Sequence, residues 1–228
     1  KKVFFTTDYY NKSLASKTPS QFYFHPNPFL LSSLTNYKGY SFKIREIDPN
    51  IFWADQKNYV KQKERHSFLW LNLIDRKNDG KSIQKIISVW IAKNSKYKSN
   101  VWDSSVVSRR VISWLLNLDI ILNNGMFQFK KSFLDSIISQ SNHLKKNIKF
   151  EKNYSKRLEV LTALLLSGLV FKEYINNFNI GIKELEKLTK DYFDDDGFPL
   201  TRNPSDLIFF AKYLLLCKEC IKDAQQYI

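Results

Sequence analysis

The sequence predicts an all-α protein, and three observations carry this prediction. From about residue 55 to the end, apolar residues recur with the period of an amphipathic helix. The 228 residues include only six glycines and six prolines, fewer than a turn-rich β protein needs. Short polar stretches, such as Lys77-Asn78-Asp79-Gly80, separate the periodic segments and are typical of helix ends.

Residues 1–54 differ in character, and we expect them to form an extended, mostly irregular N-terminal arm. Pro26, Pro28 and Pro49 interrupt any helix in this part of the chain. The segments 21–24 and 40–44 are rich in aromatic residues, and each fits a short strand or a piece of extended chain.

The remaining residues, 55–228, are expected to form one helical domain. One predicted helix begins with Asp103 or Ser104 as its N-cap and ends at Asn123-Asn124-Gly125. The short loops favour antiparallel helical hairpins. The predicted helices cover about 55–76, 81–97, 103–122, 128–148, 154–175, 179–193 and 204–228.

Composition bounds the function only loosely. Lysine and arginine number 36 and acidic residues 22, which gives a formal net charge of +14. This charge suits an anionic partner, such as nucleic acid, a membrane surface or an acidic glycan. Because the lysines are scattered, a compositional bias of the coding sequence explains the charge equally well. No apolar run reaches the roughly 18 residues of a membrane span, and no leader pattern opens the chain, so the compartment stays unassigned.

Two short motifs suggest metal or redox chemistry at first sight. Cys217 and Cys220 form a C-x-x-C, but they lie inside a helical pattern without a second ligand pair. Asp194-Asp195-Asp196-Gly197 lacks the alternating ligands of a calcium loop and fits the turn after a helix. We therefore expect no metal and no cofactor.

The most informative stretch runs from Trp102 to Trp114 and has the spacing W-x7-R-x3-W, with Arg110 as its arginine. Arg110 and Trp114 are four residues apart and share one helix face. An aromatic plane beside a guanidinium suits an acidic sugar, because the ring stacks on the pyranose and the guanidinium pairs with its carboxylate or sulfate. The alternative places Trp114 in the core and makes Arg110 an ion-pair partner at the core edge.

Together with other pieces in the same order, this motif resembles the N-terminal helical domain of heparinase II/III-type polysaccharide lyases. The resemblance covers about residues 20–225. Its pieces are 65–71 (RHSFLWL), Trp90, the W-x7-R-x3-W motif, Gln140 with Leu144, and 196–204 (DGFPLTRNP).

The resemblance implies an incomplete α/α toroid around a central groove, followed in full-length members by a β-sandwich domain that this chain lacks. Such bacterial proteins, often periplasmic, cleave uronate-containing glycans by β-elimination. An Asn or His neutralises the uronate carboxylate, a Tyr or His removes the adjacent proton, and a Tyr protonates the leaving oxygen. The residues expected to line a groove for acidic polysaccharide are Trp102, Arg110, Trp114, Arg157, Arg202 and Asn203.

The chain departs from the lyase pattern at its catalytic positions. Ser155 and Lys156 stand where the family has an Asn-His pair, Pro199 replaces a His, and Asp206 replaces a Tyr. The chain's Asn-His pair, Asn142-His143, lies too early for the family position and is a weak catalytic candidate. We therefore expect this chain alone to be inactive.

Three functions follow. The first is the helical domain of an acidic-polysaccharide lyase, which acts together with a β-sandwich of the same protein. The second is a non-catalytic glycan-binding or structural domain that kept the toroid. The third, a nucleic-acid binder, is supported by net charge alone, and no nucleic-acid-binding motif accompanies that charge; we therefore expect neither a nucleic-acid partner nor a membrane span.

Overall fold

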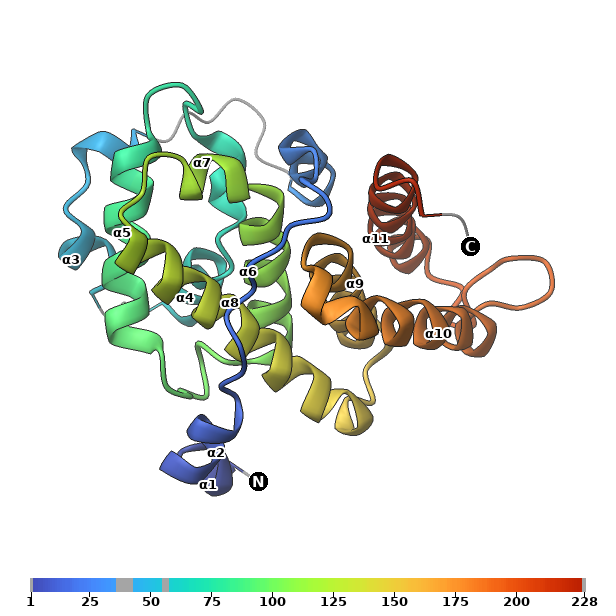
Figure 1. Cartoon of the computed structure of the whole chain (residues 1–228). Coiled ribbons are helices and arrows are strands. Elements are labelled where there is room, and N and C mark those ends of the chain that lie inside the picture. The colour runs from blue at the N-terminus through green and yellow to red at the C-terminus, as the bar shows by residue number, and fades with distance from the viewer. Residues whose placement is uncertain (1, 36–42, 55–57, 227–228) are drawn as a thin grey trace.

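The computed structural model describes residues 2–35, 43–54 and 58–226, and these residues form helices and no β-strand (Figure 1). The predicted all-α class is therefore confirmed. The α-helices are α1 (Lys2–Phe5), α2 (Asp8–Ser13), α3 (Pro49–Phe52), α4 (Tyr59–His66), α5 (Gly80–Asn94), α6 (Ser104–Leu116), α7 (Leu118–Leu122), α8 (Phe127–Asn147), α9 (Tyr154–Val170), α10 (Ile175–Tyr192) and α11 (Pro204–Asp223). Five short 3₁₀ helices join them: η1 (Pro28–Leu34), η2 (Ile44–Glu46), η3 (Leu69–Leu73), η4 (Ile148–Phe150) and η5 (Lys172–Tyr174).

Two of the predicted long helices are interrupted. The helix expected over 55–76 ends at His66, because Phe68 adopts a left-handed conformation with φ of 58° and buries its ring completely. The helix expected to run to Leu122 breaks at Asn117, whose side-chain amide donates to the Ser113 carbonyl oxygen at 2.7 Å. A side chain that bonds the local backbone in this way competes with the helix.

The first of the two expected strands, 21–24, is reduced to one contact. The helix predicted over 154–175 ends at Val170, and Phe171 is extended and forms a single antiparallel bridge with Phe22. Tyr23 N donates to the Val170 carbonyl oxygen at 2.9 Å. The second expected strand, 40–44, lies mostly outside the described residues, and Ile44 opens η2.

The N-terminal segment is packed into the body. Figure 1 shows it crossing in front of α6 and α8, between α1–α2 at one end and η1 at the other. The element η1 contacts η3, α6 and α11. Tyr10, Leu14 and Leu31 are at most 3% exposed and belong to the same hydrophobic core as the long helices. The described residues before α4 thus contain short helices joined by irregular stretches, and several of them belong to the same core as the helices that follow.

Helix α9 is the centre of the fold. Every residue from Leu158 to Val170 is buried, and the helix contacts α6, α8, α10 and α11. Two glycines allow α10 to approach it closely. A Cβ on Gly168 would lie 2.2 Å from Phe178 N, and a Cβ on Gly181 would lie 2.8 Å from Leu165 Cβ.

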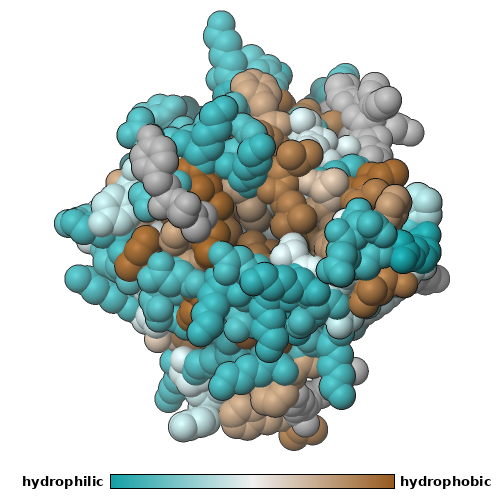
Figure 2. Space-filling model, turned by 90° about the vertical axis from the view of Figure 1, so that its right-hand side faces the viewer, coloured by the Kyte–Doolittle hydropathy of each residue, from teal (hydrophilic) through white to brown (hydrophobic). Residues whose placement is uncertain are grey.

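A shallow apolar groove remains between α10 and α11. Leu165, Ile182, Leu185, Leu214, Cys217 and Ile221 line it, and both cysteines of the chain are free and buried. Figure 2 shows this side of the molecule, where hydrophobic residues gather among hydrophilic ones. Of the helices described, none combines the length and apolar character needed to cross a bilayer.

We predict that Gly168→Ala destabilises the fold by about 3 kcal/mol, because the new methyl group would overlap the backbone of Phe178 and force α9 and α10 apart. The free energy of unfolding is measured by urea denaturation followed by circular dichroism. Gly80→Ala is the matched control. The nearest atom to its Cβ is 3.6 Å away, so its unfolding free energy should stay within about 1 kcal/mol of the parent value. Equal stability of the two variants would contradict the close approach of the helices.

Candidate functional site

Arg110 of the W-x7-R-x3-W motif lies in the core, with an exposed fraction of 0%. Its guanidinium donates to Gln140 Oε1 at 2.5 Å, to the His66 carbonyl oxygen at 2.8 Å and to the Val101 carbonyl oxygen at 3.2 Å. It also lies over the ring of Trp90, 4.3 Å from the centroid. Among the described residues it forms no ion pair, so neutral acceptors and an aromatic face stabilise the cation.

The two tryptophans of the motif are buried as well. Trp114 is 0% exposed and packs edge-on against Trp90, with ring centroids 5.3 Å apart. Trp102 is 2% exposed, and its Nε1 donates to the Asn94 carbonyl oxygen at the end of α5, at 3.1 Å. With the Arg110–Val101 bonds, this contact fixes the connection 95–103 between α5 and α6. The motif therefore shapes the core and positions a loop.

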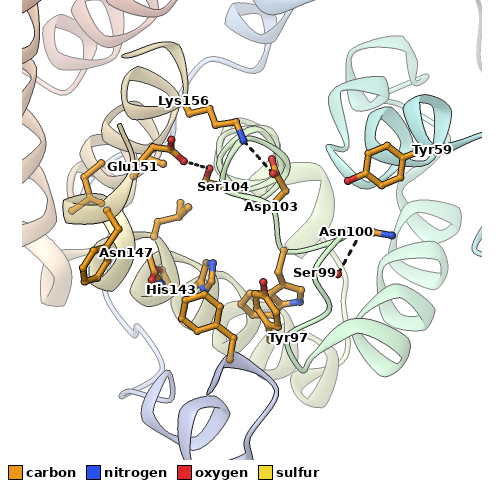
Figure 3. Close-up of a pocket in the computed structure, with 16 residues that line it drawn as sticks. Tyr59, Tyr97, Ser99, Asn100, Asp103, Ser104, His143, Asn147, Glu151 and Lys156 are labelled. Atoms are coloured by element: carbon orange, nitrogen blue, oxygen red, sulfur yellow. Dashed lines mark hydrogen bonds and ion pairs between the residues drawn. The ribbon is translucent and has the colours of Figure 1, made fainter. Parts of the chain in front are cut away.

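That loop forms the rim of a pocket of about 300 Å³, shown in Figure 3. Its lining combines aromatic rings with hydroxyl, amide and charged groups. Tyr59 comes from α4, and Tyr97, Ser99 and Asn100 come from the loop. The other lining residues come mainly from α1, α6, α8, η4 and α9. The polar lining residues labelled in Figure 3 are Tyr59, Tyr97, Ser99, Asn100, Asp103, Ser104, His143, Asn147, Glu151 and Lys156. We call this the Tyr97 pocket.

His143 lies at the base of the Tyr97 pocket and is 4% exposed. Its Nδ1 lies 2.7 Å from the Tyr10 hydroxyl, which accepts a hydrogen bond from Asn147 Nδ2 at 2.9 Å. The ring also bonds the backbone of Trp102. Tyr10 therefore donates to Nδ1, and the remaining ring N–H donates to Trp102. Burial lowers the pKa of His143 to about 4, so the ring is neutral at neutral pH and both nitrogens are engaged.

Opposite charges balance along one wall of the Tyr97 pocket. Asp103 caps α6 by accepting from Ser105 N at 3.2 Å, as the sequence predicts, and pairs with Lys156 Nζ at 3.3 Å. Lys63 Nζ lies 4.0 Å from the same carboxylate. Glu151 accepts from the Ser104 hydroxyl at 2.7 Å. Burial, followed by the charge of Asp103, raises the pKa of Tyr97 above its usual value.

The other candidate residues lie elsewhere. Asn142 donates to the Leu14 carbonyl oxygen and to Ser16 Oγ, both at 2.9 Å, and so holds the N-terminal segment against α8. Arg157 on α9 pairs with Glu184 on α10 at 3.2 Å.

Arg202 and Asn203 lie at the start of α11. Arg202 pairs with Asp194 at 2.6 Å in the turn after α10, which Gly197 closes with φ of 80°. Asn203 caps α11 by accepting from Ser205 N at 3.0 Å.

The structure therefore does not bring the six expected binding residues into one groove. Of these six, Trp102 alone lines the Tyr97 pocket, where it meets His143 with ring centroids 5.3 Å apart. Sequence reasoning missed Tyr59, Tyr97, Asn100 and Asn147 as a group. The polar, aromatic composition of the loop 95–103 was a usable signal, because loops between rigid helices often carry binding residues.

The chain matches no protein-family model, no curated protein and no solved structure. The part of the chain that the structure describes contains no group of three His, Cys, Asp or Glu side chains that could hold a metal ion.

We predict that Arg110→Lys lowers the free energy of unfolding by about 3 kcal/mol. A lysine ammonium cannot reach Gln140, His66 and Val101 together, and it leaves buried carbonyl groups without donors. Arg202→Lys is the matched control, because the Arg202 side chain is 64% exposed; it should change stability by less than about 0.5 kcal/mol. Thermal and urea denaturation measure the free energy of unfolding of the two variants. A variant Arg110→Lys as stable as the parent would show that the buried network is dispensable.

We also predict a loss of stability in mild acid that depends on His143. The folded pKa is about 4 and the ordinary value is 6.5, so the unfolded state binds the proton first as the pH falls. Stability contributed by the neutral ring is complete above pH 6.5 and declines toward pH 4, by up to about 3 kcal/mol. His143→Gln keeps an acceptor for Tyr10 and a donor for Trp102 without a titrating group. Urea denaturation across this pH range should show a shallower decline in unfolding free energy for the variant than for the parent. Equal declines in the two proteins would contradict the assignment of this pH dependence to His143.

Proposed function

We propose that this chain is the helical domain of a heparinase II/III-like protein, and that its Tyr97 pocket binds one sugar unit of an acidic polysaccharide. The observation that carries the proposal is the lining of the pocket. Rings of Tyr59 and Tyr97 stand beside the hydroxyl and amide groups of Ser99, Asn100 and Asn147. Sugars present apolar C–H faces and a rim of hydroxyls, and this combination of groups suits both.

The volume of the pocket and the charges on its wall also support a saccharide. About 300 Å³ lies at the small end of the range of small-molecule sites, which extends from about 300 to 1,000 Å³. Lys156 lines the wall beside Asp103, and Lys63 lies near the same carboxylate, so a uronate carboxylate would find a cation there. Because Asp103 already neutralises part of this charge, hydroxyl and aromatic contacts carry most of the recognition.

The proposal includes the finer architecture. The helices of the body and their short connections fit an incomplete α/α toroid, and a β-sandwich domain of the same protein would be its natural partner in the family. Under this proposal the full-length protein performs β-elimination, and groups supplied outside this chain complete the site.

Binding without turnover is the function we propose for the chain by itself. His143 has both ring nitrogens engaged and stays neutral, so it is not placed as a free base. Asp206, at the position of a family Tyr, accepts from Tyr192 at 2.9 Å and from Thr201 at 2.7 Å within the turn before α11. These contacts favour the non-catalytic alternative for this chain.

We predict that Tyr59→Ala weakens the binding of uronate oligosaccharides about tenfold, because an exposed stacking plane is lost, about 1.4 kcal/mol in free energy. Calorimetric titration with oligosaccharides of alginate, hyaluronan and heparan sulfate measures this change. Tyr23→Ala is the matched control. Tyr23 and Tyr59 are similarly exposed, and each has a lysine over its ring. Lys172 lies 5.5 Å from the Tyr23 centroid and Lys63 lies 4.7 Å from the Tyr59 centroid. Tyr23, however, does not line the pocket.

Equal affinities of the parent and Tyr59→Ala, or an equal loss in Tyr23→Ala, would place the sugar elsewhere. The same incubations test turnover through the absorbance of unsaturated uronate products. We expect absorbance equal to that of a heat-killed sample. Clear product formation would show that this chain carries a complete acid–base pair, and Asn142 and His143 would be the first residues to substitute.

A further inference from the structure

A second pocket, of about 460 Å³, lies on the other side of the loop 95–103. Its lining is basic and rich in amides. It consists of Trp53, Ala54, Gln62, His66, Lys93, Asn94, Lys98, Ser99, Asn100 and Val101, and none of these described residues carries a carboxylate. The Tyr97 pocket, by contrast, has Asp103 and Glu151 on its wall. We call the second one the His66 pocket.

His66 presents a hydrogen-bond donor to this pocket. Trp90 Nε1 can only donate, and it lies 2.9 Å from His66 Nδ1, so Nδ1 accepts and the proton of the neutral ring resides on Nε2. His66 is 7% exposed, and its Nε2 has no hydrogen-bond partner among the residues that the structure describes. Trp53 stacks on the imidazole with ring centroids 5.2 Å apart and fixes its plane. The result is an N–H group, held in place and without an acceptor among the described residues, on a side chain that lines a basic pocket.

Several cationic side chains lie near the His66 imidazole. Arg110 donates to the His66 carbonyl oxygen at 2.8 Å, Arg65 is the preceding residue, and Lys98 lines the pocket. Burial and the charges of these three groups, in that order, lower the pKa of His66 to about 3. The imidazole therefore stays a neutral donor at neutral pH, and the lysines and arginines supply the positive potential.

We propose that the His66 pocket binds an oxyanion, a carboxylate, sulfate or phosphate group, through His66 Nε2–H, Lys93 and Lys98. An oxyanion accepts several charge-assisted hydrogen bonds and would satisfy the unpartnered imidazole donor. Its source is either a free inorganic ion or an acidic group on a polymer. Ser99 and Asn100 line both pockets, so a glycan with one sugar in the Tyr97 pocket would carry its neighbouring acidic group close to the His66 pocket. This last link rests on the proposed function, whereas ion binding does not.

The test is a titration of the chain with inorganic sulfate, followed through the imidazole resonances of His66 by nuclear magnetic resonance. We expect these resonances to shift and saturate. The double variant Lys93→Gln/Lys98→Gln should bind sulfate about tenfold more weakly, because two cations of the site are lost. Both lysines are exposed, so the substitutions leave the core intact.

The matched control is the double variant Lys81→Gln/Lys85→Gln. It removes two exposed lysines from α5, the helix that also carries Lys93, and leaves the same net charge as the first double variant. Sulfate affinity should equal that of the parent. An equal loss of sulfate affinity in the two double variants would mean that sulfate binding depends on the overall charge of +14, and would overturn the proposal. Imidazole resonances of His66 that do not shift when sulfate is added would overturn the proposal as well.

Two further measurements identify the source of the oxyanion and distinguish oxyanion binding in the His66 pocket from glycan binding in the Tyr97 pocket. Tyr59→Ala should leave sulfate affinity unchanged, since Tyr59 does not line the His66 pocket. If uronate oligosaccharides bind more tightly than free glucuronate and lose affinity in Lys93→Gln/Lys98→Gln, the oxyanion belongs to the glycan. If sulfate binds as predicted and the oligosaccharides fail to bind, the His66 pocket takes a free ion and the proposed glycan function alone is wrong.

Discussion

The buried guanidinium of Arg110 is the constraint around which this fold is organised. A cation removed from water costs several kcal/mol, and no carboxylate among the described residues pairs with Arg110 to offset that cost. Arg110 is instead met by Gln140 on α8, by the carbonyl oxygen at the end of α4 and by the carbonyl oxygen of Val101. Three separate parts of the chain must therefore reach one point on α6. Loss of any one leaves the charge undersolvated, which explains why the loop 95–103 is fixed.

The same charge adds to the effect of burial on two histidines. Arg110 contributes to the lowered pKa of both His66 and His143, after the larger effect of burial. Each ring is thereby kept neutral, and a neutral imidazole has one donor and one acceptor. His143 uses both within the protein, through Tyr10 and Trp102. His66 uses its acceptor for Trp90 and keeps its donor for the second pocket. Two neutral histidines thus give the two pockets different chemistry, because their ring nitrogens have different partners.

How much of this could be predicted from the sequence depends on how local each feature is. Helices α5, α8 and α11 follow from apolar periodicity and end signals, and the caps Asp103 and Asn203 act within two residues of their own positions. The shared face of Arg110 and Trp114 is likewise a matter of helix geometry. Helix geometry does not determine whether that face meets solvent or the core, because this depends on which distant elements cover the face. The sequence offered both interpretations, and in this structure the face is covered.

The features that sequence reasoning missed all depend on long-range contacts. Tyr10 lies 133 residues from its partner His143, and no periodicity links them. The left-handed turn at Phe68 is favourable because Trp53, Trp70, Trp90 and Trp114 surround the ring, and these come from four parts of the chain. Local preferences alone predict a continuous helix there, and tertiary packing decides otherwise.

The net charge of +14 acquires a physical meaning only through its placement. Where lysines border the Tyr97 pocket, Asp103 pairs with Lys156 and draws Lys63 near, so the local field is small. Around the His66 pocket, the described lining residues supply two lysines and no carboxylate. Attraction between scattered surface charges and a polyanion fades over about 8 Å at physiological salt. A half-enclosed donor with fixed geometry is screened less. Scattered lysines would therefore give binding that disappears as salt rises, whereas a site built on His66, Lys93 and Lys98 would keep part of its affinity.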